Sequence, residues 1–447
     1  MKKTDVMKVV AGLFILGLAI IFFLVFTRSQ VEVVFPQVNH IGAAGPVRLD
    51  FTKSMDTASV EERISIVPQV EARFKWVEKT LWIWPETPLE LGEYELVLQP
   101  GSKNLKGRPI EETAVWTFSI RDPQLVFLYP ANGKADLWKY DSVSGRNTQL
   151  TSTDGKVYDY TVSKDGELIV FSVTNALGGY DLWTIGRDGD NPKKLVDCGN
   201  EVCIEPAISP DGLRIAYSRA AWAAGESLAG STIWLVDIKG KKSSLLVDDP
   251  AIYGTGSVWS PLGDRLAFLD ETNGLFRIFD FKKLEITNLQ SAGQEAGAWS
   301  PDGSKMLIPS EYLVGIQSFT GLSLVDFEAQ ITEPLFTQNQ NTVDYFAPDY
   351  SPRGNEIIVG RREQLTNGRS SSQIWLVDLG SKKLEPITND HNYSHGGFHW
   401  SPTGNQVVYQ RYSLGSSKAT PEILLWDRDS GTSKLIIENA AIPQWLP

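Results

Sequence analysis

Three histidines recur at intervals of four residues in the segment HNYSHGGFH: His391, His395 and His399. On a helix this spacing would align them as metal ligands. The pair Gly396 and Gly397, with strand-like residues after it, instead favours a loop that leads into a strand. We therefore expect no metal ion and no other cofactor. His391 and His395 remain candidate binding residues, whereas His399 is expected inside the strand.

Carboxylates precede the expected inner strands of a repeated unit: Asp159, Glu205, Glu295, Asp344 and Asp349. If such side chains converged at one mouth of a central channel, a pair of them could perform acid–base chemistry. The motifs GxxxxGK[ST], GxGxxG, HExxH and GxSxG are missing from the sequence. We therefore predict that the chain is not an enzyme. An enzyme that acts on a glycan or a peptide through these carboxylates is the alternative.

The two cysteines, Cys198 and Cys203, have four residues between them. A zinc site would need further cysteine or histidine ligands nearby, and the sequence offers none. We predict a disulfide, which would indicate an oxidising compartment. Two reduced, buried thiols are the alternative. A loop this short would gain only about 2 kcal/mol from the crosslink in the chain-entropy model.

The formal net charge is −12, and no basic stripe occurs along the chain. Affinity for nucleic acid comes mainly from lysine and arginine at phosphates. The composition therefore argues against nucleic acid as a partner. An acidic surface of this kind is typical of a soluble protein body.

Residues 9–26, VVAGLFILGLAIIFFLVF, form an 18-residue run without a charged side chain. At 1.5 Å per residue a helix of this length spans about 27 Å, which approaches the thickness of a bilayer core. Lys2, Lys3 and Lys8 precede the run, so the positive-inside rule places the N-terminus in the cytoplasm. We predict an uncleaved single-pass anchor over residues 1–30 and an extracytoplasmic body. A cleaved signal peptide is the alternative.

Residues 31–121 contain short alternating strands, among them GPVRLDFT (45–52), TLWIW (80–84) and AVWTFSI (114–120). This pattern predicts a small β-sandwich whose core includes Trp76, Trp82, Trp84 and Trp116. The order of FTKSMD (51–56), FKWVEKTLWIWPETPLELGEYELVL (74–98) and WTFSI (116–120) resembles the bacterial Ig-like domain of S-layer proteins. The resemblance implies a spacer or interaction module without catalytic residues.

A serine followed three residues later by glycine recurs six times from residue 163 onward, in SKDG, SPDG, SPLG, SPDG, SPRG and SPTG. Alternating strands such as RIAYSR (214–219) and IWLVD (233–237) follow the motifs. Four strands in about 40–50 residues are typical of one propeller blade. Proline and glycine suit the tight turn in each motif.

The segment from 124 to 447 begins with three strands of a blade that lacks its first strand, and it ends with IPQWLP (442–447). The C-terminal strand therefore completes that blade, and we predict seven blades, with six as the alternative. The repeats resemble the TolB-like propellers of bacteria, which imply the fold and only weakly a function. The fold class is thus all-β, with an N-terminal transmembrane helix, an Ig-like sandwich and a propeller.

Long irregular segments connect the second and third strands of most blades, and loops on a rigid scaffold often carry binding residues. The apolar candidates there are Trp222, Tyr312, Leu313 and Phe319. If exposed, they would form an interface; folding back over the propeller is the alternative. We predict a membrane-anchored binding or scaffold protein whose propeller recognises a protein or cell-envelope partner.

Overall fold

The computed structural model describes residues 33–36, 39–221, 230–240, 242–290, 297–336, 343–364, 370–415 and 419–447. The chain divides into two compact units. Unit 1 comprises the described residues up to Asn39 together with Pro46–Glu86 and Gly92–Ile120. Unit 2 comprises His40–Gly45, Thr87–Leu91 and Arg121–Pro447.

The described residues are nearly all β-structure, and they contain no helix with the length and hydropathy needed to span a bilayer. The predicted fold class, which included an N-terminal transmembrane helix, is corrected on this point. Residues 9–26, on which that prediction rested, lie outside the described residues.

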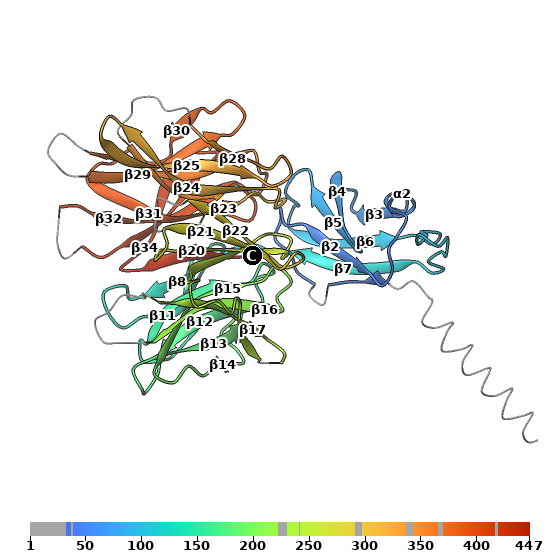
Figure 1. Ribbon diagram of the computed structural model, residues 1–447, viewed down its shortest axis with the longest axis horizontal. Coiled ribbons are helices and arrows are strands. Elements are labelled where there is room, and N and C mark those ends of the chain that lie inside the picture. The colour runs from blue at the N-terminus through green and yellow to red at the C-terminus, as the bar shows by residue number, and fades with distance from the viewer. Residues whose placement is uncertain are drawn as a thin grey trace, which may run out of the picture. The chain divides into compact units, whose positions relative to one another are not determined.

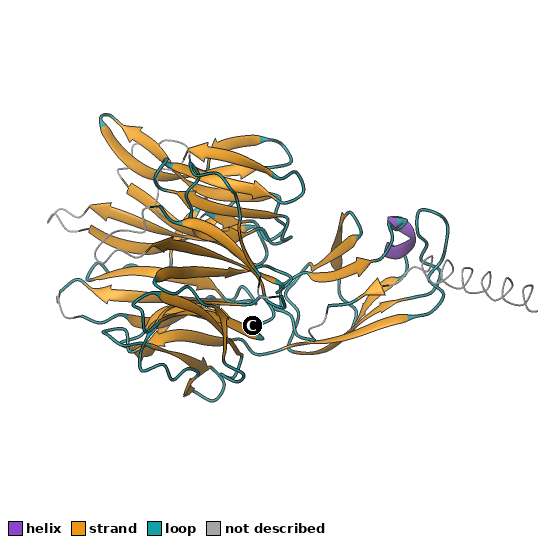
Figure 2. Ribbon diagram, turned by 60° about the horizontal axis from the view of Figure 1, so that its bottom comes forward, coloured by secondary structure: helices purple, strands orange, loops and turns teal. Residues whose placement is uncertain are grey.

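Unit 1 consists of two antiparallel sheets and one short helix, α2 (Thr57–Glu61). The strand orders are β1-β2-β5-β4 and β3-β6-β7. The strands are β1 (Val33–Val34), β2 (Val47–Phe51), β3 (Ile64–Val67), β4 (Ala72–Val77), β5 (Thr80–Pro85), β6 (Gly92–Leu98) and β7 (Ala114–Ile120). Figure 2 shows α2 in purple among orange strands.

The core of unit 1 follows from the alternation of apolar residues along its strands. Trp82, Trp84 and Trp116 are each at most 6% exposed, as the sequence predicts. Trp76 is only partly buried, and its indole N–H donates to Glu61. Burying such large side chains contributes much of the stability of a small sheet pair.

Unit 2 is a propeller whose described strands form seven four-stranded blades. Two of these blades are joined into one eight-stranded sheet by the parallel pair Tyr180 and Val202. Figure 1 shows the blades as successive sheets from green to red. Blade 1 contains β35 (Ala441–Leu446), β8 (Gln124–Tyr129), β9 (Asp136–Asp141) and β10 (Arg146–Gln149), and blade 2 contains β11 (Val157–Val162), β12 (Leu168–Thr174), β13 (Tyr180–Gly186) and β14 (Lys193–Val196). Blade 3 contains β15 (Glu201–Ile208), β16 (Arg214–Ala221), β17 (Thr232–Asp237) and β18 (Ser243–Leu245). Blade 4 contains β19 (Thr255–Trp259), β20 (Arg265–Asp270), β21 (Leu275–Asp280) and β22 (Glu285–Gln290).

The other three blades have the same strand order, in which each strand pairs with the next along the chain. Blade 5 contains β23 (Ala298–Trp299), β24 (Lys305–Val314), β25 (Gln317–Asp326) and β26 (Ile331–Pro334). Blade 6 contains β27 (Val343–Tyr350), β28 (Glu356–Gln364), β29 (Ser370–Asp378) and β30 (Leu384–Pro386). Blade 7 contains β31 (Tyr393–Trp400), β32 (Gln406–Ser413), β33 (Glu422–Asp427) and β34 (Thr432–Glu438).

Blade 1 is composite, as the sequence predicts. Strand β35 pairs antiparallel with β8, so that Trp445 lies opposite Leu125. Trp445 is 9% exposed and Leu446 is fully buried. Because β35 occupies the edge of β8, that edge is not open to another strand.

The Ser-Pro motifs form the turns between the first and second strands. In the motif at Ser209, the hydroxyl contacts Asp211 at 2.5 Å and accepts the backbone N–H of Arg214 at 2.9 Å. Gly212 has φ = 68°, a left-handed conformation that glycine adopts without steric cost. The repeated motif is therefore explained by turn geometry.

The tryptophan before a motif ties its strand to the preceding blade. The indole N–H of Trp259 donates to the carbonyl of Ala207 at 3.0 Å. Trp299 donates to Val258 at 3.2 Å, and Trp445 donates to His399 at 3.1 Å. Each bond joins the first strand of one blade to the first strand of the blade before it. First strands therefore lie next to one another and form the innermost layer of unit 2.

Candidate functional site

A β-bulge recurs in the first strands of unit 2. The pairing register shifts within β11, β15, β19, β27, β31 and β35. Bulges bend a strand and re-aim its side chains, and they are common beside functional sites. We name the following residues at these shifts the bulge ring: Asp159, Glu205, Gly256, Ala347, Gly397 and Ile442.

Five residues of the bulge ring have left-handed backbone conformations. The φ angles are 60° for Gly256 and 54° for Gly397. The non-glycine residues Glu205, Ala347 and Ile442 have φ angles of 54°, 45° and 54°. A side chain with positive φ is uncommon and costs about 1 kcal/mol or more, most of all for a β-branched residue such as isoleucine.

Asp159 and Glu205 are hydrogen-bonded in the same way within neighbouring blades. The Ser172 hydroxyl donates to Asp159, and the Ser218 hydroxyl donates to Glu205 at 2.7 Å. Asp159 also accepts the backbone N–H of Glu205 at 2.6 Å. Glu205 in turn accepts the backbone N–H of Gly256 at 2.8 Å. A chain of hydrogen bonds therefore crosses blades 2, 3 and 4 through the bulge ring.

Burial raises the pKa of Asp159 from 3.8 to about 6, and the nearby charge of Glu205 also raises it. The hydrogen bonds from Ser172 and from the Glu205 amide act in the opposite direction, because they stabilise the ionised form. A carboxyl group with a pKa close to neutrality can both donate and accept a proton under physiological conditions. Asp159 thus has the property required of a general acid or base.

Neither carboxylate of this pair is neutralised by the part of the chain that the structure describes. Asp159 and Glu205 belong to none of the ion pairs formed there. Both side chains are partly exposed. An unneutralised, partly buried carboxylate pair favours a cationic group or a proton supplied from outside.

Tyr158 lies near the two carboxylates, and Ile442 occupies the bulge of the neighbouring blade 1. Tyr158 is 51% exposed, and its ring lies edge-on to Tyr180, with ring centroids 5.1 Å apart. The charges of Asp159 and Glu205 help to raise the pKa of Tyr158, after burial as the main cause. In blade 1, Ile442 is 40% exposed, and its carbonyl accepts the hydroxyl of Tyr160 at 2.5 Å.

The other predicted carboxylates lie apart from this pair. Asp344 accepts the backbone N–H of Thr320 at 2.9 Å, so it fixes a hairpin of blade 5. Asp349 accepts the backbone N–H of Trp400 at 3.0 Å and links blades 6 and 7. Glu295 lies outside the described residues. The structure thus brings together Asp159 and Glu205 from the predicted set.

The three histidines occupy different environments. His391 is exposed in a turn, whereas His395 is 4% exposed within β31, and its Nδ1 lies 3.1 Å from the carbonyl of Ser372. Burial lowers the pKa of His395. The side chain of His399 is 50% exposed and lies 3.8 Å from Asp349. His399 lies within β31, as expected, whereas His395, which was expected in the loop, lies in the same strand and is buried. Among the described residues, no group of three or more histidine, cysteine or acidic side chains is arranged to hold a metal ion.

Tyr312, Leu313 and Phe319 lie on a regular hairpin, not on the irregular loop that the sequence suggests. Strands β24 and β25 pair through ten residues each. The ring of Tyr312 lies 5.6 Å from that of Phe319, and its hydroxyl donates to the carbonyl of Val343 at 2.5 Å. Leu313 is 61% exposed and Ile316 is fully exposed at the turn. The predicted residue Trp222 lies outside the described residues.

Cys198 and Cys203 form a disulfide in the structure, and both residues are at most 4% exposed. The bond closes the connection between β14 and β15, two residues before Glu205. The backbone N–H of Cys198 donates to Asp181 at 3.0 Å, and Asp181 pairs with Lys194. The disulfide and the hydrogen bond to Asp181 therefore fix the start of the strand that carries Glu205.

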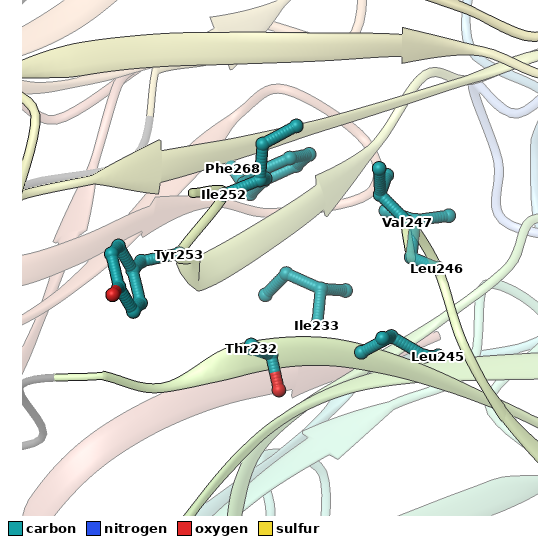
Figure 3. A pocket seen from close by; sticks show the side chains of 8 residues that line it. All are labelled: Thr232, Ile233, Leu245, Leu246, Val247, Ile252, Tyr253 and Phe268. Atoms are coloured by element: carbon teal, nitrogen blue, oxygen red, sulfur yellow. The ribbon is translucent and has the colours of Figure 1, made fainter. Parts of the chain in front are cut away.

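A small pocket lies elsewhere in unit 2, between β17 and β20 (Figure 3). Its wall is mostly aliphatic, with Phe268 at one side, and Thr232 and Tyr253 supply the polar groups. It contains no carboxylate, histidine or cysteine. This pocket offers no group for acid–base or nucleophilic chemistry, so the bulge ring is the stronger candidate.

Sequence reasoning singled out Asp159 and Glu205 but missed Tyr158 and Ile442. A signal for the ring was present, because Asp159, Glu205 and Gly256 each stand four residues before a motif serine. Aligning the repeats at that offset would have placed these positions together. Residue type alone does not reveal the bulge, because the residues at this position include carboxylates, glycines, an alanine and an isoleucine.

No family model matches the chain. The curated protein "Uncharacterized peptidase YuxL" of Bacillus subtilis is 26% identical over 235 residues, which represent 48% of this chain and 31% of that protein. The chain thus spans about a third of the length of this relative. The similarity to a peptidase contradicts our expectation that the chain is not an enzyme, and we withdraw that expectation.

Solved structures that resemble the chain include TolB proteins, a β-propeller domain and peptidases. TolB from Acinetobacter baumannii is 17% identical, with a TM-score of 0.43 over 72% of this chain and 82% of that chain. The β-propeller domain of the Trilobed protease from Pyrococcus furiosus is 12% identical, with a TM-score of 0.48 over 82% and 96%. A prolyl endopeptidase is also 12% identical, with a TM-score of 0.48 over 84% and 50%. The neighbours thus include TolB and propellers of peptidases.

Proposed function

We propose that this chain acts in peptide hydrolysis and that its propeller binds the peptide at the bulge ring. The observation that carries the proposal is the pair of neighbouring carboxylates, Asp159 and Glu205, which no cationic side chain of the described residues neutralises. The similarity to a curated peptidase supports a peptide over a glycan as the substrate.

The chemistry that we propose uses the two carboxyl groups in different protonation states. Asp159, whose pKa is raised to about 6, would donate a proton to the scissile carbonyl oxygen. Glu205 would take a proton from the attacking water, whose oxygen forms the new bond to the carbonyl carbon. Protonated Glu205 then gives its proton to the amide nitrogen as the carbon–nitrogen bond breaks. One hydroxyl of the tetrahedral intermediate returns its proton to Asp159, and a carboxylic acid and an amine are released.

Backbone groups of the bulge ring are suited to hold an extended peptide. At Gly256 and Ala347 the ring presents little or no side chain, so a ligand can approach the main chain closely. Main-chain hydrogen bonds to an extended peptide are a common mode of peptide recognition. The carboxylates would then act on a peptide that is positioned by the opposite part of the ring.

The test is incubation of the purified protein with a mixture of synthetic peptides, followed by mass spectrometry of the products. We expect cleavage that is lost in Asp159→Asn and in Glu205→Gln. Asp344→Asn is the matched control, because its carboxylate binds a backbone N–H but lies outside the ring. Unchanged cleavage in both ring variants would overturn the assigned roles. Wild-type protein that neither cleaves nor binds any peptide would overturn the whole proposal.

We also propose that the propeller works in an oxidising compartment. The disulfide between Cys198 and Cys203 supports this placement, since such bonds persist mainly outside the reducing cytoplasm. Alkylation of intact cells before lysis, followed by mass spectrometry of the peptide that holds both cysteines, is the test. Recovery of both residues as alkylated thiols would contradict the proposal.

A further inference from the structure

The bulge ring is chemically asymmetric. Blades 1, 2 and 3 contribute Ile442, Asp159 and Glu205, whereas blades 4, 6 and 7 contribute Gly256, Ala347 and Gly397. One side of the ring therefore presents large side chains, and the other presents mainly backbone. The corresponding position of blade 5 lies outside the described residues.

Contacts connect the ring positions from Gly397 through Ile442, Asp159 and Glu205 to Gly256, so this part of the ring is continuous. Gln410 accepts the backbone N–H of Ile442 at 2.8 Å and also packs against Gly397. On the other side of Ile442, the amide of Gln444 donates to the carbonyl of Tyr160 at 2.9 Å, which joins blades 1 and 2. The hydrogen bonds described above continue the series from Asp159 to Gly256.

Two features beside the carboxylates are independent of their charge. Ile442 is 40% exposed. Its backbone has positive φ, and the residue at the same position is glycine or alanine in blades 4, 6 and 7. The ring of Tyr158 is 51% exposed and is supported by Tyr180. An exposed aromatic face attracts a cation, most strongly where a carboxylate adjoins it. An exposed isoleucine offers an apolar contact.

We infer that the side of the bulge ring built by blades 1 to 3 selects peptides in which a cationic group adjoins an apolar side chain. The cation, a lysine or arginine side chain or a free amino terminus, contacts Asp159, Glu205 and the ring of Tyr158. The adjoining apolar side chain contacts Ile442. This inference rests on the proposed peptide function and specifies the substrate class of the same site.

The experiment compares three capped pentapeptides by isothermal titration calorimetry with the full chain. Their central residues are Leu-Lys-Leu, Leu-norleucine-Leu and Gly-Lys-Gly, so that the second peptide lacks only the charge and the third lacks only the apolar neighbours. We expect the first to bind about tenfold or more tightly than either of the others, which corresponds to about 1.4 kcal/mol. The preference for lysine should weaken with added salt.

The variants separate the two contacts. Glu205→Gln keeps an oxygen for the Ser218 and Gly256 hydrogen bonds but removes the charge, so the preference for lysine over norleucine should fall close to onefold. Ile442→Gly should leave that preference intact and abolish the preference for leucine neighbours. It also relieves a strained backbone, so misfolding is not the expected cause of any loss. Asp344→Asn is the matched control, because its carboxylate lies outside the ring, and it should change neither ratio.

The outcomes distinguish this inference from the proposal on which it rests. If all three peptides bind equally to the wild-type protein, the selectivity is wrong while peptide binding stands. If none of them binds, but other peptides are bound or cleaved, the inferred substrate class is also wrong. If no peptide of any kind is bound or cleaved, the proposed function itself fails.

Discussion

Replacing Asp159 with asparagine is expected to change how the stability of the propeller depends on pH. The pKa of this carboxyl is 3.8 in its ordinary state and about 6 in the folded chain, chiefly because of burial. A group with a raised pKa binds its proton more tightly when folded. Its ionisation therefore lowers the free energy of unfolding as the pH rises from about 4 to above 6.

The two pKa values set an upper limit of about 3 kcal/mol for this loss of stability. Because the side chain is partly exposed, solvent screening reduces the expected effect to about 1–2 kcal/mol. Asp159→Asn cannot ionise, but its amide oxygen can still accept a hydrogen bond from Ser172 or from the Glu205 amide. The variant should therefore gain about 1–2 kcal/mol relative to the wild type between about pH 4 and about pH 7.5.

The assay is urea unfolding followed by tryptophan fluorescence at several pH values, with both proteins measured under identical conditions. Asp378→Asn is a control of opposite sign, because backbone hydrogen bonds, chiefly from Ser381, lower the pKa of Asp378. Its wild-type contribution is present above the unfolded pKa and is lost as the pH falls through the folded value. A difference between Asp159→Asn and wild type that stays constant with pH would refute the reasoning about burial.

Trp445→Ala should lower the free energy of unfolding by about 3–5 kcal/mol, because the indole is 9% exposed and closes blade 1; an unchanged urea midpoint would show that β35 is dispensable. Asp270→Ala should lower the free energy of unfolding by about 3–5 kcal/mol in the same assay, because it leaves the buried guanidinium of Arg277 without its carboxylate. The double variant with Arg277→Met should recover part of that loss. Leu313→Ser with Ile316→Ser should leave the thermal midpoint within a degree or two, because both side chains are exposed. A clear drop in that midpoint would mean that the turn is packed.

The sequence predicted the propeller from features that turn geometry dictates. Each Ser-Pro motif requires a glycine with positive φ, so the spacing of the motifs set the number of blades. The tryptophan before the motif and the match of IPQWLP to that strand then predicted ring closure. These signals are local, and they depend on residues within a few positions of one another.

The errors arose where function depends on contacts that are distant in sequence. Tyr312 and Phe319 are in a segment that mixes polar residues with glycine, so the regular β24–β25 hairpin was taken for a loop. The pairing of Asp159 with the backbone of Glu205 joins two blades, and no spacing within one repeat reveals it. The expectation that the protein is not an enzyme rested on missing sequence motifs. Such motifs do not report carboxylate pairs that form only when the chain folds.

The composite blade has a consequence for synthesis on the ribosome. Leu128 pairs with Ala441, although 313 positions separate them in the chain. At about 5–20 residues per second, the edge of β8 waits about 15–60 seconds for its partner strand to be made. During that time it presents unpaired backbone groups that invite mispairing with other nascent chains. The completed blade therefore removes a hazard that exists only while the protein is being translated, and a chaperone that covers β8 would act within this interval.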